Sequence, residues 1–257
     1  MMLPEYGVSN KLERRIGRKI VPFFGRRMMH FKIDRPIVSI SFDDFPKSVM
    51  EKALPMLDKF DWKATFYVAA SLENITNHLG LHYSRHDLEK LRNENHEIGC
   101  HTYHHLNIAK LSARRVNEQV QSNTQGMKAL GHKQKMVTFA YPFGETSIRC
   151  KKQLASEFVS MRGIMPGIHY NKVDLNQIKS VTVYSGPTLE NTCKYIESLE
   201  KKPGWLTLFT HDIRDNPSEW GCTPEDFQKV LNLIHKTGAI VLPIQRAIDF
   251  LNDAKFE

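Results

Sequence analysis

The sequence lacks long hydrophobic runs and has few cysteines. No stretch approaches the ~20 consecutive apolar residues that span a bilayer, and the N-terminus has no uninterrupted apolar segment of a secretory signal. The 4 cysteines include no C-x-x-C pair, which excludes a zinc ribbon and a thioredoxin-like redox motif. We therefore expect a cytoplasmic protein with reduced thiols, while the even number of cysteines leaves disulfides open.

Acidic residues are scarce in the first 35 positions, where nine basic residues oppose three acidic ones. This segment has a net charge of +6, out of +8 for the whole chain, so the remainder is almost neutral. A sequence pI near 9.2 therefore does not indicate nucleic-acid binding by the main body, and we expect no nucleic-acid partner.

Residues 11–24 have the pattern of a basic amphipathic helix, which Pro22 ends or kinks. Its apolar residues are Leu12, Ile16, Ile20, Phe23 and Phe24. Such a helix can lie on the inner face of an anionic membrane as a peripheral contact. Alternatively, its apolar stripe packs on the domain or on a second subunit of an oligomer.

From residue 36 onward, apolar and β-branched runs alternate with helical patterns. The predicted strands are 37–42, 64–69, 96–100, 137–140, 157–162, 180–184, 204–210 and 239–242. The predicted helices are 47–60, 84–94, 112–130, 147–156, 188–201, 223–237 and 244–253. Strands separated by helices predict a parallel sheet with right-handed crossovers, and this number of units favours a closed or nearly closed β/α barrel. We expect one barrel domain, 36–257, preceded by a basic extension, 1–35.

Two helix starts are well marked in the sequence. Ser84 with Asp87 resembles a capping box, with Asp in place of Glu. Thr223 precedes a proline and two acidic residues, the arrangement of an N-cap, and Gly238 is placed to end the same helix.

The strand over 37–42 ends in two adjacent carboxylates, Asp43 and Asp44. Two anions at the end of a buried strand are costly unless a cation or a proton shares the site. The pair therefore indicates a functional site, and the alternative is a helix N-cap before a helix that begins near Lys47.

Histidines follow two other predicted strands. His101 and His105 are four residues apart, so in a helical turn both imidazoles would face one metal ion. The competing metalloprotease motif H-E-x-x-H fails, because Cys100 stands where the second histidine would follow His96. His211 ends the strand over 204–210, where it is either catalytic or structural.

The predicted strand over 137–140 is followed by Tyr141-Pro142-Phe143-Gly144, a tight turn. Its backbone N–H groups could face an oxyanion, and the alternative is a simple β-turn.

In this order, Asp43-Asp44, His101-Thr-x-x-His105, x-x-Pro-Phe143-Gly and Leu-x-Leu-x-x-His211 resemble the polysaccharide deacetylase family, also called the NodB-homology domain or carbohydrate esterase family four. The resemblance covers residues 36–250. The subgroup it resembles most has Phe-Ala-Tyr-Pro-aromatic-Gly, found here at 139–144. The resemblance implies a distorted (β/α)7 barrel of the NodB-homology type.

The resemblance also implies roles for individual residues. Asp44, His101 and His105 match the family's metal ligands, for Zn²⁺ or alternatively Co, Mn, Fe or Ni. Asp43 matches the general base and His211 the general acid that protonates the leaving amine. The backbone N–H of Phe143 would help to hold the oxyanion of the tetrahedral intermediate.

The chain departs from the family pattern at two positions. Phe45 replaces a common glycine and is expected to narrow the mouth of the site and to affect substrate choice. Ala140 replaces the arginine that orients the base, and Arg162, at the end of the strand over 157–162, is the expected replacement through an ion pair with Asp43. An exposed surface arginine is the alternative.

Two further expectations concern the carboxylate partner of His211 and the residues that contact the sugar. Asp212 and Asp174 are candidates for its carboxylate partner. Trp220 and Tyr141 are candidates to stack on a sugar ring.

These observations predict a metal-dependent hydrolase that removes the N-acetyl group of an amino-sugar unit in a glycan or glycan precursor. The alternatives are a non-catalytic metal- and carbohydrate-binding homologue, an O-acetyl sugar esterase and an N-formyl sugar deformylase at the same site.

Overall fold

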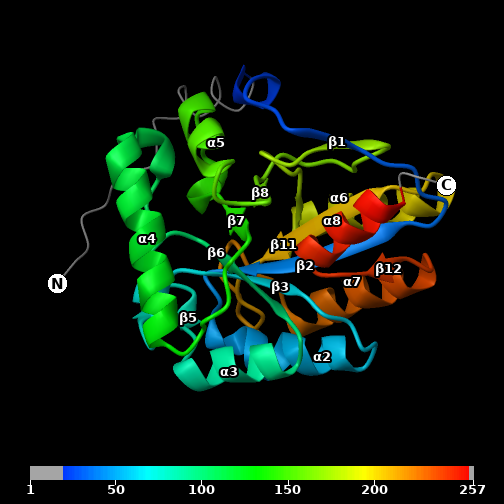
Figure 1. Cartoon of the computed structure of the whole chain (residues 1–257). Helices are drawn as coiled ribbons and strands as arrows, with labels where there is room; N and C mark the ends of the chain where they lie inside the picture. The colour runs from blue at the N-terminus through cyan, green and yellow to red at the C-terminus, as the bar shows by residue number, and fades with distance from the viewer. Residues whose placement is uncertain (1–19, 255–257) are drawn as a thin grey trace.

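The computed structural model describes residues 20–254 (Figure 1). The predicted helix over 11–24 therefore lies mostly outside the described residues. Its described end is a short 3₁₀ helix, η1 (Val21–Phe23), with Pro22 near its start. None of the helices in residues 20–254 combines the length and the hydropathy needed to cross a bilayer.

The centre of the molecule is a parallel sheet in the order β10-β11-β2-β3-β6-β7-β8, with the short β12 also paired to β2. The strands are β2 (Ile37–Asp43), β3 (Thr65–Val68), β6 (Glu97–Cys100), β7 (Thr138–Ala140), β8 (Ser160–Arg162), β10 (Val181–Thr182), β11 (Trp205–Thr210) and β12 (Ile240–Val241). All eight predicted strands are confirmed, several of them shorter than predicted. Every residue of β2 and β11 is buried, which explains their nearly continuous apolar runs.

Helices surround this sheet, with α2, α3 and α7 below it and α5 above it in Figure 1. They are α2 (Leu54–Asp58), α3 (Arg85–Asn93), α4 (Ala113–Ala129), α5 (Ile148–Leu154), α6 (Pro187–Lys201), α7 (Pro224–Lys236) and α8 (Ile244–Asp253). A π-helical turn, η2 (Val49–Ala53), leads into α2. Leu54 donates to the carbonyl of Val49, five residues back, and the next residue, Pro55, has no N–H to continue an α-helical ladder. The architecture is the predicted (β/α) barrel of the NodB type.

The predicted helix caps are confirmed. The Ser84 side chain accepts from the N–H of Asp87, whose carboxylate accepts from the N–H of Ser84. Thr223 accepts from the N–H of Asp226, and Gly238 follows α7 at φ +67°. These local signals are strong because each satisfies backbone groups that a helix end leaves unpaired.

Several short elements were not predicted. The strands β1 (Met28–His30) and β9 (Lys172–Asp174) pair with each other, as do β4 (Thr76–Asn77) and β5 (Gly80–Leu81). Three 3₁₀ turns, η3 (Ala70–Leu72), η4 (Ile108–Lys110) and η5 (Pro142–Gly144), lie in the loops, and the last of them falls on the predicted tight turn. The other pieces are too short to show a periodic pattern in the sequence.

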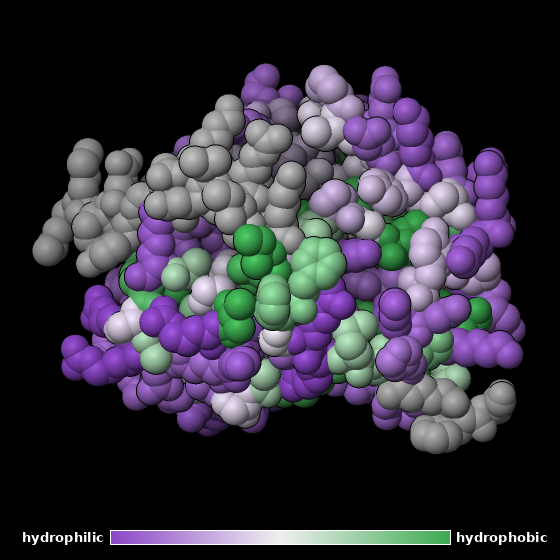
Figure 2. All heavy atoms as spheres, turned by 90° about the horizontal axis from the view of Figure 1, so that it is seen from above, coloured by the Kyte–Doolittle hydropathy of each residue, from purple (hydrophilic) through white to green (hydrophobic). Residues whose placement is uncertain are grey.

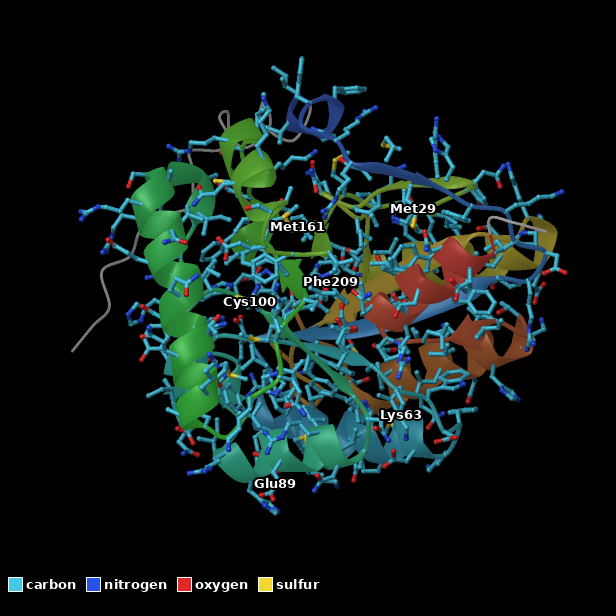
Figure 3. The ribbon with its side chains drawn as sticks, viewed as in Figure 1. Met29, Lys63, Glu89, Cys100, Met161 and Phe209 are labelled. Carbon is cyan, nitrogen blue, oxygen red and sulfur yellow. The ribbon has the colours of Figure 1, made fainter. Side chains whose placement is uncertain are left out.

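Two groups of buried apolar side chains form the core. The larger lies between the sheet and the helices and includes Phe42, Phe66 and Phe139. The smaller includes Ile37 and Trp205 together with residues of β1 and α8. Figure 3 shows Phe209 in the middle of the fold, whereas Glu89 lies at the margin on α3. The cysteines at 100, 150, 193 and 222 are all free and buried.

The buried His169 leads to a prediction about stability and pH. Burial, and then the charge of Lys179, lower its pKa to about 3, and its Nε2 accepts the N–H of Lys179 at 3.1 Å. Below pH ~6.5 the imidazole of His169 therefore binds a proton in the unfolded chain but not in the folded protein. Stability should fall as the pH drops from 6.5 toward 3, by about 1.4 kcal/mol per pH unit for this one group.

The measurement is urea denaturation of the wild type and of His169→Gln over that pH range. The free energy of unfolding of the variant should fall less steeply with decreasing pH than that of the wild type. The expected difference in slope is that of one bound proton, about 1.4 kcal/mol per pH unit. Equal slopes for the two proteins would contradict the assignment.

Candidate active site

The carboxylate pair lies at the carboxyl end of the central strand. Asp43 is the last residue of β2, and the chain then adopts left-handed backbone angles at Asp44 (φ +59°) and Phe45 (φ +52°). Left-handed backbone angles at two successive residues other than glycine are uncommon, so contacts with neighbouring residues must stabilise them. The carbonyl of Asp44 bonds to Nδ1 of His82 at 2.8 Å, and the carbonyl of Phe45 accepts the N–H of Tyr83 at 3.1 Å.

Asp44 faces two imidazoles. Its Oδ1 lies 3.8 Å from Nε2 of His101 and 3.7 Å from Nε2 of His105. The three potential ligand atoms lie within 4.8 Å of one another. The expectation that a helical turn aligns the two histidines is wrong, because residues 101–107 form a loop with positive φ at Thr102 (+63°) and His105 (+51°). The loop aligns them instead.

The residues present suit a divalent metal ion. Asp44 Oδ1 is buried and has no hydrogen-bond partner within residues 20–254, so it is available as a ligand. Nδ1 of His101 donates to the carbonyl of Ala140 at 2.8 Å, which leaves the lone pair of Nε2 directed at Asp44. Two imidazole nitrogens and one carboxylate oxygen are a ligand set of the kind that Zn²⁺ takes.

The charge states agree with that use. Burial, and then His105, lower the pKa of His101 to about 4. Burial alone would raise the pKa of Asp44, but His105 and His101 outweigh it and hold that pKa at about 2. At neutral pH, Asp44 is thus ionised and His101 neutral, the forms that bind a metal.

Asp43 is held by Arg162 rather than by the histidines. Nη2 of Arg162 contacts both carboxylate oxygens of Asp43, with 2.6 Å to Oδ1, and both side chains are buried. The guanidinium carbon lies 4.5 Å above the ring of Phe209. Arg162 and Ala140 are direct partners across β8 and β7. An arginine on β8 therefore reaches the carboxylate from the strand next to the one where the family arginine would stand.

His211 lies beyond the end of β11 and is half-buried. Its Nδ1 is 3.1 Å from the carbonyl oxygen of Trp220. Neither predicted carboxylate partner contacts it, and both predictions are wrong. Asp212 accepts from Ser218 and lies 2.7 Å from Nε of Arg214, while Asp174 accepts from Lys151 at 2.9 Å. Both carboxylates are thus bonded to other groups. The imidazole of His211 is oriented by the backbone carbonyl of Trp220 instead.

Phe143 and Trp220 border the site. Phe143 has φ +58°, its ring centroid lies 4.5 Å from that of His105, and it is 40% exposed. Trp220 is 39% exposed and meets His78 edge to face at 5.2 Å. Asn107, which follows the histidine loop, donates to Glu145 at 2.6 Å and so ties this loop to the turn at Phe143.

Two expected substrate contacts are wrong. Phe45 is fully buried, stacked on Tyr83 with ring centroids 5.2 Å apart, so it packs in the core and does not narrow the mouth. Tyr141 is 1% exposed, and its hydroxyl donates to the carbonyl of Asn176 at 2.9 Å, so its ring cannot stack on a sugar.

His82 is a site residue that the sequence did not reveal. It is fully buried, it bonds to the Asp44 carbonyl, and its Nε2 has no partner among the described residues. No motif marks it, because its role depends on the isolated antiparallel bridge between Pro46 and His82. It holds the strained backbone that directs Asp44 toward the imidazoles.

Replacing His82 by alanine is expected to weaken Zn²⁺ binding by ~10–100-fold without unfolding the protein, since outer partners of metal ligands typically contribute that much. Calorimetric titration of the metal-free protein with Zn²⁺ measures this. His82→Asn keeps a donor near the position of Nδ1 and should recover part of the affinity. Equal affinity of His82→Ala and the wild type would contradict the role.

A second group of potential ligands, Asp58, Glu94 and His96, lies away from this site. Nδ1 of His96 accepts the N–H of Ala64 at 3.0 Å, which leaves the proton of the neutral ring on Nε2. That nitrogen is a donor and has no lone pair for a metal, so the group lacks its third ligand.

Comparison with known proteins places this geometry in context. The polysaccharide deacetylase family model matches residues 32–158. The match includes Asp43, Asp44, His101, His105 and Phe143, and it ends before Arg162 and His211. An uncharacterized protein of Bacillus subtilis (strain 168), YlxY, is 33% identical over 113 residues, which are 43% of this chain and 32% of that protein. The aligned part thus spans about a third of that curated relative's length.

Two solved structures share the fold. The chitin deacetylase of the fungal pathogen Colletotrichum lindemuthianum has a TM-score of 0.60 at 14% identity, over 87% of this chain and 91% of that one. A family 4 acetyl xylan esterase from Clostridium thermocellum, in complex with a cobalt ion, has a TM-score of 0.58 at 19% identity, over 83% and 91% of the two chains. The family model thus matches the part of the chain that holds the carboxylate pair and the two histidines, and the solved structures are similar to it in fold.

Proposed function

We propose that this protein is a metal-dependent deacetylase that hydrolyses the N-acetyl amide of an amino-sugar unit in a glycan or glycan precursor. The observation that carries the proposal is the ion pair between Arg162 and Asp43 beside the group of Asp44, His101 and His105. It supplies a carboxylate that has no share in metal binding and is fixed next to the ligands. A module that only binds metal and sugar would need neither this carboxylate nor His211.

Asp44, His101 and His105 would hold the ion, for which we propose Zn²⁺. When bound, such an ion polarises a carbonyl oxygen as a Lewis acid and favours deprotonation of water. The remaining chemistry belongs to the side chains around it.

Asp43 accepts a proton from the water that attacks the acetyl carbonyl carbon, and Arg162 keeps the carboxylate directed at that water. The backbone N–H of Phe143 stabilises the oxyanion that forms. His211, with both ring nitrogens protonated, then gives the proton of its Nε2 to the sugar nitrogen as the C–N bond breaks and becomes neutral, which releases acetate and a free amine. The contact of Nδ1 with the Trp220 carbonyl keeps Nε2 turned toward the leaving group.

The ring of Trp220, whose backbone carbonyl contacts His211, is partly exposed and is the proposed platform for the sugar face. We also propose that the chain belongs to the subgroup with Phe-Ala-Tyr-Pro-aromatic-Gly. In this chain the alanine of that motif stands opposite an arginine on the neighbouring strand. The extension over 1–35 and the cytoplasmic location stay predictions.

The test is release of acetate from N-acetylglucosamine oligosaccharides by the Zn²⁺-loaded protein. A chelator should abolish release, and added Zn²⁺ should restore it. Parallel assays with O-acetylated xylan and N-formylglucosamine separate the esterase and deformylase alternatives. Absence of turnover on every acylated sugar, with the metal bound, would leave only the non-catalytic homologue and would overturn the proposal.

A further inference from the structure

The short helix η1 and the residues around it expose an unusual amount of apolar surface. Ile20 is 49%, Phe23 68%, Phe24 52% and Met28 40% exposed. We call these four side chains the η1 surface. Of the ten large apolar side chains exposed among the described residues, four thus come from residues 20–28. Figure 2, which views this face from above, shows hydrophobic side chains gathered near its centre with hydrophilic ones around them. Scattered apolar residues are normal on a surface, but a local group of them marks an interaction site.

Residues 20–28 are bonded to the rest of the domain, so the side chains of the η1 surface are held in place. The guanidinium of Arg27 donates to the carbonyls of Ala155, Phe158 and Val159 at 3.1, 2.9 and 2.6 Å. The carbonyl of Gly25 accepts from Asn176 at 2.9 Å. Gly25 has φ +58°, a left-handed turn that directs η1 away from the strand pair of β1 and β9. The apolar groups are therefore presented to solvent by a fixed support.

The charges beside the η1 surface are positive. The guanidinium of Arg26 lies 5.1 Å from the ring centre of Phe23, and Arg26 is exposed. Lys152 of α5, which lies close to Gly25, is exposed as well. The carboxylate of Asp174, which accepts the N–H of Arg27, is also paired with Lys151. Exposed phenylalanines mixed with exposed cations are complementary to an anionic lipid surface, which solvates the rings and attracts the charges.

The η1 surface lies beside α5, the helix that follows the turn at Phe143. A Cβ placed on Gly25 would meet Ile148, Lys151 and Lys152 of α5 at 3.6–3.7 Å, so α5 lies close to this turn, and α5 begins four residues after Gly144 of the site turn. The η1 surface therefore borders the helix that follows the turn at Phe143. A membrane bound there would lie on the side of the molecule where that helix starts.

We propose that the η1 surface binds the protein to an anionic membrane surface, with Phe23 and Phe24 inserted among the lipid headgroups. The proposal does not depend on deacetylase activity, because it uses none of the residues of the site.

The experiment is co-sedimentation of the full-length protein with vesicles of phosphatidylcholine, alone or mixed with phosphatidylglycerol. The wild type should bind the anionic vesicles and bind less as salt is added. The double variant Phe23→Ser, Phe24→Ser should lower the vesicle partition coefficient at least tenfold. The matched control is Ile75→Ser, Leu81→Ser, which removes two side chains of similar exposure, 47% and 46%, elsewhere on the surface and should change binding less than twofold.

Two outcomes would overturn the proposal. One is equal binding of the Phe23, Phe24 variant and the wild type to anionic vesicles, or no binding by either. The other is a dimer of the wild type in analytical ultracentrifugation that this variant dissociates, which would make the surface an interface between two copies of the chain.

Discussion

Replacing Asp43 by asparagine should lower kcat for acetate release by ~10²–10⁴-fold, the range that correctly placed proton transfer contributes. Asparagine keeps the shape of the side chain and can still contact Arg162, but it cannot accept the proton of the attacking water. Zn²⁺ affinity should change little, because Asp43 contacts Arg162 and is not among the grouped ligand residues. Steady-state kinetics together with calorimetric Zn²⁺ titration measure both effects.

The matched control for this variant is Asp44→Asn. It changes the neighbouring carboxylate, which faces His101 and His105, and should therefore weaken Zn²⁺ binding as well as activity. If Asp43→Asn loses its metal while Asp44→Asn keeps it, the two roles are exchanged. If Asp43→Asn retains activity within tenfold, Asp43 is not the base.

Replacing Arg162 by methionine should reduce both stability and activity. It leaves Asp43 buried without its cation, and breaking a buried ion pair from one side typically costs ~3–5 kcal/mol. The kcat for acetate release should fall as well, because the carboxylate of Asp43 is no longer held toward the attacking water. Urea denaturation and steady-state kinetics measure the two effects.

Two further variants separate a positioning role from simple packing. Asp43→Asn combined with Arg162→Met removes both partners, so it should be more stable than Arg162→Met alone. Ala140→Arg combined with Arg162→Ala returns the cation from the adjacent strand position, because Ala140 and Arg162 are partners across β7 and β8. It should recover part of the activity. If Arg162→Met loses activity and the Ala140→Arg, Arg162→Ala variant recovers none of it, Arg162 only fills space.

Much of the architecture was readable in the amino-acid order because its signals are local. The buried strands β2 and β11 appear as nearly unbroken apolar runs, and Ser84 and Thr223 mark the N-termini of the helices that they cap. The grouping of Asp44 with His101 and His105 also follows from local order, since residues at the carboxyl ends of parallel strands meet on one face of a barrel. The contact of Arg162 with Asp43 was expected because Ala140 stands where the resembled family has its orienting arginine, and Arg162 ends another strand of the same barrel.

Other features depend on contacts between distant parts of the chain, and no pattern in the sequence encodes them. Phe45 and Tyr141 were expected at the site mouth but turn into the core, because a left-handed backbone at Phe45 and a hydroxyl partner at Asn176 direct them there. The orientation of His211 by the Trp220 carbonyl, and of Asp44 by His82, depends on where two loops fold back. The chain's local preferences therefore establish which chemical groups reach the rim of the barrel. Packing over long sequence distances decides which of those groups face one another, because an aromatic ring or an imidazole can turn inward or outward at nearly the same local cost.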